Sequence, residues 1–393
     1  MLIGAAIVLA ALIRDVFARL GVPALVGYVG LGLLLRVADS QWGVLNEAAA
    51  RGFDLLASLG IVALLFKVGL ESHPAALAEK LPQATVVWLG NMGLAAAAGF
   101  VAAYYVVGLG LVTALVVAVA LTATSVGVAV AVWEEAGALD SSNGQLLVDV
   151  AELDDISGVA LMALLLAVVP LLNGGDGELW GTIGATAAGF LAKFALFAGL
   201  CYLFAHYMER SLIRIAARLE RLPGRMLTVV GVGMIIAAAA GWLGFSLAIG
   251  ALFAGLVFSR DPEATKTERS FIDLYEFLTP FFFIGIGLQM EPAALGPALD
   301  LGLVLLVAAV LGKVVGAALP ALLITGTGSA VILGLSMVPR AEIAMVVVYE
   351  ARRLLGARGV PDAVYGAMAV VSVGTSVLAP IALRRMFNRW PQT

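Results

Sequence analysis

Residues 298–324 read ALDLGLVLLVAAVLGKVVGAALPALLI, an apolar run with one aspartate near its start and one lysine near its middle. About 20 apolar residues in a helix span the hydrocarbon core of a bilayer. In hydrocarbon, every backbone N–H and C=O must be satisfied within the protein, so only helices and closed barrels can cross it. A barrel strand alternates apolar and polar residues over about ten positions, and this run does not alternate. The run therefore predicts a transmembrane helix with a lysine at membrane depth.

Twelve further runs of the same kind fill most of the chain. Hydrophobic residues make up 62% of the 393 residues and charged residues 13%, whereas soluble domains carry about 25% charged residues. So few charges cannot cover a soluble particle of this size, and we predict an all-α polytopic membrane protein. The predicted spans are 1–20, 23–38, 53–71, 82–107, 110–133, 144–171, 179–206, 225–241, 243–259, 270–290, 298–324, 328–351 and 362–387.

Composition and motifs exclude several functions. The net charge of −4 provides no positive field for nucleic acid, and the single Cys201 cannot form an internal disulfide. The sequence has no nucleotide-binding loop and no cluster with metal-ligand spacing, and its membrane serines lack a histidine partner. We therefore predict neither an enzyme nor a bound cofactor.

The distribution of lysine and arginine predicts the orientation. With the N-terminus outside, fourteen of these residues fall in inner loops and the C-terminal tail, and five fall in outer loops. Because positive charges accumulate on the cytoplasmic side, we predict a cell (inner) membrane protein with its C-terminus in the cytoplasm.

A weak internal repeat links two spans. Residues 68–74 read VGLESHP and residues 286–292 read IGLQMEP, at the ends of the third and tenth spans. An offset of seven spans inverts the topology, as an inverted repeat requires. Polar breaks follow at similar distances, at Thr124 and at Pro339, and each predicts a discontinuous helix.

Several charged residues lie within predicted transmembrane spans. A charged side chain at the centre of such a span costs about 2.5–3.5 kcal/mol of insertion free energy. The acidic ones in span 144–171 are Asp149, Glu152, Asp154 and Asp155, and the later spans add Lys313, Arg340 and Glu342. Thr122, Thr124 and Ser125 form the polar break of span 110–133.

The adjacent aspartates predict coupled chemistry. Asp154 and Asp155 point about 100° apart on a helix and contact different neighbours. Desolvation and mutual repulsion favour protonation, and a carboxylate that holds either a proton or a metal cation couples the two by competition. We expect Lys313 to pair with one aspartate while the other binds ions, and we expect Arg340 and Glu342 to compensate neighbouring charges or helix termini.

Five motifs in order carry a family resemblance: 65–71 (LFKVGLE), 122–127 (TATSVG), 153–156 (LDDI), 311–316 (LGKVVG) and 337–342 (MVPRAE). Together they resemble the monovalent cation/proton antiporter superfamily, in its bacterial sodium/proton branch with thirteen spans. The resemblance implies two crossed, broken helices and exchange of Na⁺ or Li⁺ for protons by alternating access, electrogenic because two aspartates accompany the lysine.

The resemblance also implies residue roles. Asp155 would be the main binding carboxylate for the transported cation and proton, and Asp154 the partner of Lys313. Thr124 and Ser125 would be the contribution of the broken helix, and Arg340 and Glu342 would compensate charge.

The implied architecture has two parts. Residues 82–171 and 298–389 would form the ion-transporting core, and residues 1–81 and 225–297 the scaffold of a homodimer. Residues 172–224 would form a linker helix and a cytoplasmic connection.

One departure from the family pattern concerns Glu152, which replaces a usually apolar residue, with Asp149 a turn earlier. Residues 149, 152 and 155 follow an i, i+3 spacing and share one stripe of the helix. We interpret the first two as the lining of a cytoplasmic funnel through which cations enter.

Two other functions stay open from sequence. A potassium/proton exchanger or efflux transporter has a related fold but more often a Gln-Asp pair and a cytosolic nucleotide-binding domain. An organic-anion/sodium symporter shares a crossed-helix core but needs a roomier polar cavity.

Overall fold

The fold is all helical in a computed structural model of the chain. The model describes residues 1–20, 23–71, 74–139, 141–172, 179–208, 211, 224–243, 245, 247–259, 264–340 and 342–392. These residues form fifteen α-helices, one π-helical turn η1 (Ala102–Val106) and one 3₁₀ turn η2 (Pro292–Ala294), and no strand lies among them. The helices are α1 (Leu2–Arg19), α2 (Ala24–Trp42), α3 (Glu47–Glu71), α4 (Pro74–Val101), α5 (Leu111–Ala120), α6 (Val126–Glu135), α7 (Ser142–Leu172), α8 (Leu179–Tyr207), α10 (Gly224–Trp242), α11 (Leu247–Phe258), α12 (Ala264–Leu288), α13 (Leu295–Ala321), α14 (Thr327–Ser336), α15 (Glu342–Gly359) and α16 (Asp362–Arg389).

Each predicted span coincides with one of these helices or with a consecutive pair of them. Five helical stretches among the described residues are long and apolar enough to cross a membrane: Glu47–Leu70, Pro82–Val106, Ala188–Tyr207, Pro292–Ala321 and Asp362–Arg389. The all-α fold is thus confirmed, while the number of thirteen crossings stays a prediction.

The chain divides into two compact units. One contains residues 1–7, 45–74 and 166–285, and the other contains residues 8–44, 75–165 and 286–393. The second unit holds both of the helices that were predicted to be broken. The division into scaffold and core that the resemblance implies stays a prediction.

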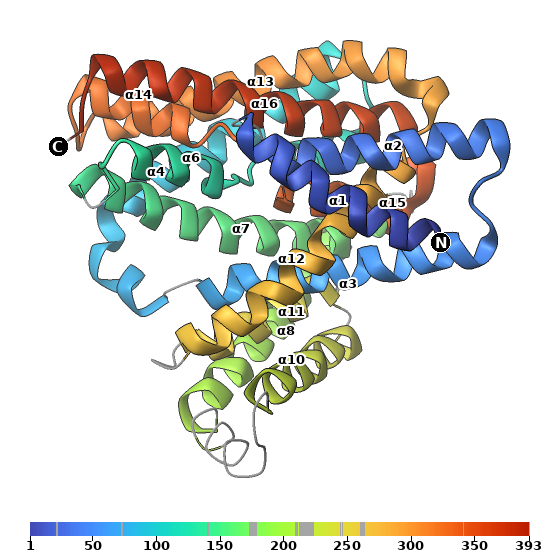
Figure 1. The fold of residues 1–393 in the computed structure, drawn as a ribbon. Coiled ribbons are helices and arrows are strands. Elements are labelled where there is room, and N and C mark those ends of the chain that lie inside the picture. The colour runs from blue at the N-terminus through green and yellow to red at the C-terminus, as the bar shows by residue number, and fades with distance from the viewer. Residues whose placement is uncertain are drawn as a thin grey trace. The chain divides into compact units, whose positions relative to one another are not determined.

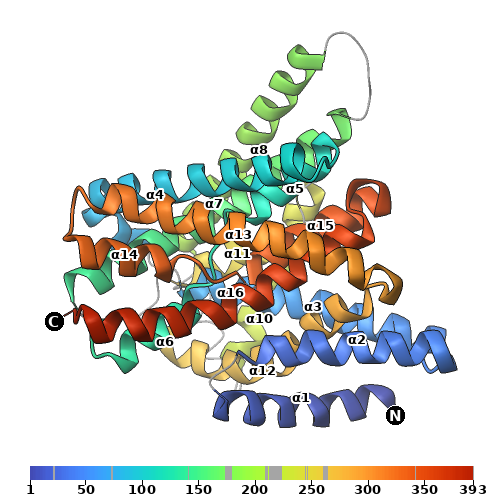
Figure 2. The same ribbon diagram turned by 90° about the horizontal axis from the view of Figure 1, so that it is seen from above.

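The two broken helices lie in the second unit. α5 and α6 are separated by residues 121–125, and α14 and α15 by residues 337–341. Pro339 has no N–H to continue its helix, and Ser125 has an extended backbone with φ −97° and ψ 91°. Figure 2 shows α5 beside α15 and α6 beside α14, so the first half of each broken helix packs against the second half of the other. This confirms the two crossed, discontinuous helices.

Two glycines of the sequence repeat make equivalent contacts. Gly69 at the end of α3 lies against the backbone of α11 at Gly255, and Gly287 at the end of α12 lies against α2 at Gly32. At each site, a Cβ atom on the repeat glycine would collide with a backbone carbonyl, a Cα and an N in the same register. The contact of α3 with α11 is thus repeated by the contact of α12 with α2, which supports the inverted repeat.

Several helices extend beyond their predicted spans: α3, α4 and α12 begin six to eight residues earlier. The span predicted to end at residue 351 continues as α15 to Gly359, with a non-helical backbone at Gly356. Arg352 was expected in a loop, but its Nη2 lies 2.5 Å from Asp362 Oδ1, its Nη1 donates to Val360 O at 3.2 Å, and its guanidinium covers the Tyr365 ring. These groups compensate the charge of Arg352 within α15.

α13 connects the two discontinuous helices to the rest of the second unit. α13 packs along α16 and also contacts α14 (Figure 1). Gly302 of α13 lets Val370 of α16 approach closely, and Gly334 of α14 lies against the carbonyl of Val314 on α13. These contacts place the middle of α13, with its lysine, against the helix breaks.

Candidate functional site

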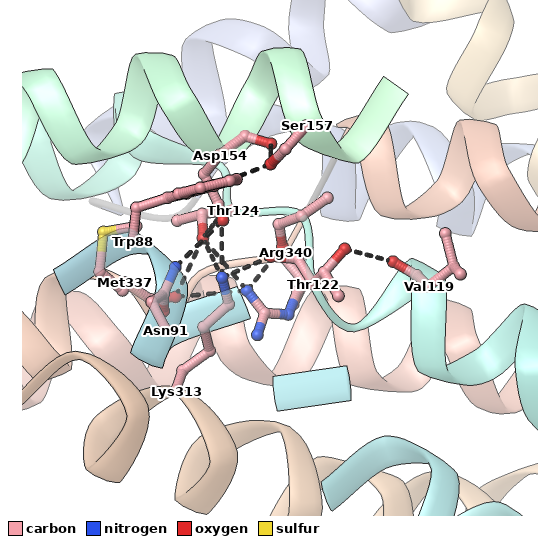
Figure 3. A network of polar contacts seen from close by, with 11 residues as sticks. Trp88, Asn91, Val119, Thr122, Thr124, Asp154, Ser157, Lys313, Met337 and Arg340 are labelled. Carbon is pink, nitrogen blue, oxygen red and sulfur yellow. Dashed lines mark hydrogen bonds and ion pairs between the residues drawn. The ribbon is translucent and has the colours of Figure 1, made fainter. Parts of the chain in front are cut away.

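The two helix breaks meet at their irregular segments (Figure 3). The N–H of Ser125 donates to the carbonyl of Pro339 at 2.8 Å. The buried guanidinium of Arg340 donates from Nη1 to the carbonyls of Ala123 at 2.6 Å and Met337 at 3.2 Å. A helix end leaves carbonyls without intrahelical donors. One arginine therefore satisfies a carbonyl from each break and ties the two segments together.

Lys313 provides a second buried cation at this point, with 0% of its surface exposed. Its Nζ donates to Asp154 Oδ2 at 2.9 Å, to Thr124 Oγ1 at 2.8 Å and to the carbonyl of Thr122. An ammonium group has three donors, so each N–H of Lys313 has an acceptor. This compensation makes a fully buried charge tolerable.

Asp154 receives hydrogen bonds on both carboxylate oxygens and is 1% exposed. Oδ2 accepts from the Thr124 hydroxyl at 2.5 Å as well as from Lys313, and Oδ1 accepts from Asn91 Nδ2 at 3.1 Å. Of the two aspartates, Asp154 is thus the one that is bonded to the lysine and has hydrogen bonds on both carboxylate oxygens.

Asp155 has a different environment from its neighbour. It is the next residue on α7, is only partly buried, and lies close enough to Lys313 for an electrostatic interaction. Asp149 and Glu152 are also partly buried and belong to the same stripe of α7. The two adjacent aspartates of α7 thus differ in exposure: Asp154 is buried, and Asp155 is more accessible.

The structure brings together most of the residues that the sequence singles out. Thr124, Asp154, Lys313 and Arg340 are directly hydrogen bonded, with Asp155 beside them. Ser125 contributes its backbone N–H to the contact between the breaks. Asp149 and Glu152 lie nearer the start of α7, and Glu342 begins α15, although its side chain lies outside the described residues.

Three hydroxyls of α16, which were not among the predicted site residues, hydrogen bond to the peptide groups of Arg340. Thr375 Oγ1 accepts from the Arg340 N–H at 2.9 Å, and Ser372 and Ser376 donate to the Arg340 carbonyl at 2.9 and 3.1 Å. Their i, i+3, i+4 spacing places them on one helix face. That spacing, within an apolar span, is the signal that could have indicated a polar contact.

Two indole N–H groups, also outside the predicted site residues, connect neighbouring helices by hydrogen bonds. Trp88 Nε1 donates to Ser157 Oγ at 2.9 Å, and this serine donates to the carbonyl of Asp154 at 3.1 Å. Trp133 Nε1 donates to Ser336 Oγ at 2.8 Å. The first pair fixes the α7 backbone at the site, and the second joins α6 to α14.

The chain matches a family model along almost its whole length. The family described as "Sodium/hydrogen exchanger, transmembrane" matches residues 4–389. The chain is 26% identical to the high-affinity Na(+)/H(+) antiporter NhaS3 of Synechocystis sp., over 87% of this chain and 73% of the relative. It is 25% identical to the Na(+)/H(+)-K(+) antiporter GerN of Bacillus cereus, over 95% of this chain and 92% of the relative.

The fold also resembles a solved structure. It superposes on the sodium proton antiporter MjNhaP1 from Methanocaldococcus jannaschii with a TM-score of 0.71, covering 98% of this chain and 95% of that one. The sequence identity between the two is 15%, so this likeness concerns the fold alone.

Proposed function

The chain belongs to the sodium/hydrogen exchanger family, and we propose that it exchanges Na⁺ for protons across a membrane at Asp155. The proposal depends on one observation above all. A buried Lys313–Asp154 pair lies where two broken helices meet, with the less buried Asp155 next to it. Because the lysine is bonded to Asp154, we assign the less buried neighbouring carboxylate to the transported ion.

Competition for one carboxylate couples the two fluxes. Either a proton or a bound Na⁺ neutralises Asp155. Because an uncompensated charge at membrane depth is expensive, the loaded site moves more easily than the empty one, and the two fluxes are coupled.

The architecture extends the proposal. Residues 82–171 and 298–389 move as the transporting core against a scaffold of residues 1–81 and 225–297, which forms a homodimer. The N-terminus lies outside and the C-terminus in the cytoplasm of the cell (inner) membrane. More than one proton moves per cation, so exchange is electrogenic. Support for these statements comes from the resemblance of the five motifs and from the lysine and arginine distribution.

Proton flux in liposomes tests the function directly. We expect an imposed Na⁺ or Li⁺ gradient to drive protons across vesicles containing the purified protein, and a clamped membrane potential to change the rate. Equal or greater flux with K⁺ would favour the potassium/proton alternative, which the name of GerN also includes. Sodium uptake that requires an organic anion and moves no protons would contradict antiport.

Glu152→Gln tests the proposed cytoplasmic funnel. Removing one negative charge near Asp155 should raise the apparent KM for Na⁺ by about two- to fivefold at low salt. The effect should shrink as salt is added, since the Debye length is only about 10 Å at 0.1 M. The matched control is Glu47→Gln on α3, where the side chain is exposed and paired with Arg51. An unchanged KM and salt dependence in Glu152→Gln would refute the funnel.

A further inference from the structure

Glu350 is a buried carboxylate that the exchange mechanism above does not use. It lies in α15, and only 9% of its surface is exposed. Arg353, one turn further along the helix, interacts with it electrostatically, but among the residues that the structure describes no hydrogen bond or ion pair reaches the Glu350 carboxylate. Since buried charges are usually paired or bound to a metal ion, this carboxylate requires an explanation.

The internal repeat gives Glu350 a counterpart in the other half of the protein. The two helix breaks, residues 121–125 and 337–341, are 216 positions apart in the sequence. At the same offset, residues 130–134 read VAVWE and residues 346–350 read VVVYE. Glu134 near the end of α6 is therefore the counterpart of Glu350, and each glutamate follows its helix break by nine positions.

The inverted topology assigns these two glutamates to opposite boundaries of the membrane. Broken helices of transporters meet near the bilayer midplane. Nine helical residues rise about 14 Å, close to half of the roughly 30 Å thickness of the hydrocarbon core. Glu134 is exposed, as expected for a charged residue at the end of a span, whereas Glu350 is buried. Burial is thus the property that distinguishes Glu350 from its counterpart.

Glu350 also shares a side of α15 with a residue that contacts α7 beside Asp155. Asp155 and Gly158 are one turn apart on the same side of α7. A Cβ atom on Gly158 would be 3.6 Å from Ile343 Cγ2, so Ile343 of α15 faces α7 at this point. Glu350 follows Ile343 by seven residues, which is two turns on nearly the same side of the helix. Asp155 and Glu350 therefore belong to the facing sides of two helices, with Glu350 nearer the end of α15.

We propose that Glu350 is a second cation-binding carboxylate, which holds the transported monovalent cation at the membrane boundary between the water and Asp155. This rests on the proposed exchange function. A carboxylate supplies the oxygen ligands that hard cations prefer, and the bound cation provides the charge compensation that the described protein groups do not. The positive charge of Arg353 weakens the binding, so that the cation can leave again. Because α15 ends on the outer side in the proposed orientation, this site serves that side alone.

Transport kinetics measured from each side test the proposal in vesicles that hold the protein in one orientation. In Glu350→Gln we expect the KM for Na⁺ to rise about three- to tenfold on the side where α15 ends, with kcat from that side retained. Na⁺ leaving on that side passes the same site, so kcat in the opposite direction should fall by a similar factor at unchanged KM. Glu134→Gln is the matched control and should leave the KM on the Glu350 side unchanged. Arg353→Gln should lower that KM, because it removes the opposing positive charge.

Two further measurements separate binding from long-range attraction and from misfolding. Choline chloride at about 0.3 M screens exposed charges, whereas the effect of a buried contact persists. The KM increase in Glu350→Gln should therefore remain in choline chloride. The variant should also melt no lower than the wild type, since the substitution breaks no ion pair among the described residues.

Carbodiimide labelling provides a readout that does not need transport. Mass spectrometry of the peptide that contains Glu350 measures its modification in detergent, in either choline or Na⁺. We expect labelling in choline and protection by Na⁺, and we expect the protection to persist in Asp155→Asn.

Several results would overturn the proposal: equal KM increases on both sides, an increase that disappears in choline chloride, no labelling of Glu350 in choline, or protection that is lost in Asp155→Asn. Absence of cation-driven proton flux in the wild type would instead refute the exchange function. The labelling would still decide whether Glu350 binds Na⁺.

Discussion

Asp155→Asn is expected to abolish cation-dependent proton movement in liposomes while leaving the protein folded. An amide neither binds a proton near neutral pH nor supplies the negative charge that attracts Na⁺. The substitution also removes the negative charge that a proton or a cation would otherwise neutralise. The core then needs no bound ion in order to move, so its movement is no longer coupled to transport. We expect a loss of at least about a hundredfold, comparable to removing almost 3 kcal/mol of differential interaction.

Controls separate this effect from misfolding. Glu152→Gln makes the same acid-to-amide change one helical turn away and should retain exchange at saturating Na⁺. The melting temperature of Asp155→Asn in detergent should match the wild type, because the buried pair of Asp154 and Lys313 is intact. Normal exchange by Asp155→Asn would remove this residue from the mechanism.

The helix breaks could be predicted from sequence because local chemistry causes them. Proline at 339 removes a backbone donor wherever it occurs in a helix, and the polar run of Thr122, Thr124 and Ser125 stands out within an apolar span. Both breaks are present at these positions. Features that depend on residue type and short-range spacing can therefore be recovered from the chain alone.

The partners of Lys313 and Asn91 depend on helix packing and could not be predicted from the residues alone. Reasoning from the residues predicted that Lys313 pairs with one of two adjacent aspartates, but which one faces α13 depends on the rotation of α7. Asn91 could not be assigned either, because a single amide in an apolar run gives no indication of its partner. Its contact depends on Gly90 meeting Gly316 from a distant part of the sequence. Such approaches are visible only in three dimensions.

Lys313→Ala is expected to lower the free energy of unfolding by about 3–5 kcal/mol, the usual cost of removing one partner of a buried ion pair. Asp154 would be left with hydrogen bonds from Thr124 and Asn91 only. A thermal melt in detergent measures the change. Lys193→Ala, which removes an exposed lysine from α8, should shift stability by no more than about 0.5 kcal/mol.

A double substitution shows whether charge or volume causes the loss. Lys313→Met keeps most of the side-chain volume, and Asp154→Asn keeps a polar group that can bond to Thr124 and Asn91, so the pair carries no charge. Since replacing a buried ion pair by a neutral pair is often nearly neutral for stability, the double variant should melt close to the wild type and well above Lys313→Ala. If Lys313→Ala itself melts like the wild type, the ion pair does not stabilise the fold. If the double variant melts as low as Lys313→Ala, the loss comes from packing around α13 rather than from an uncompensated carboxylate.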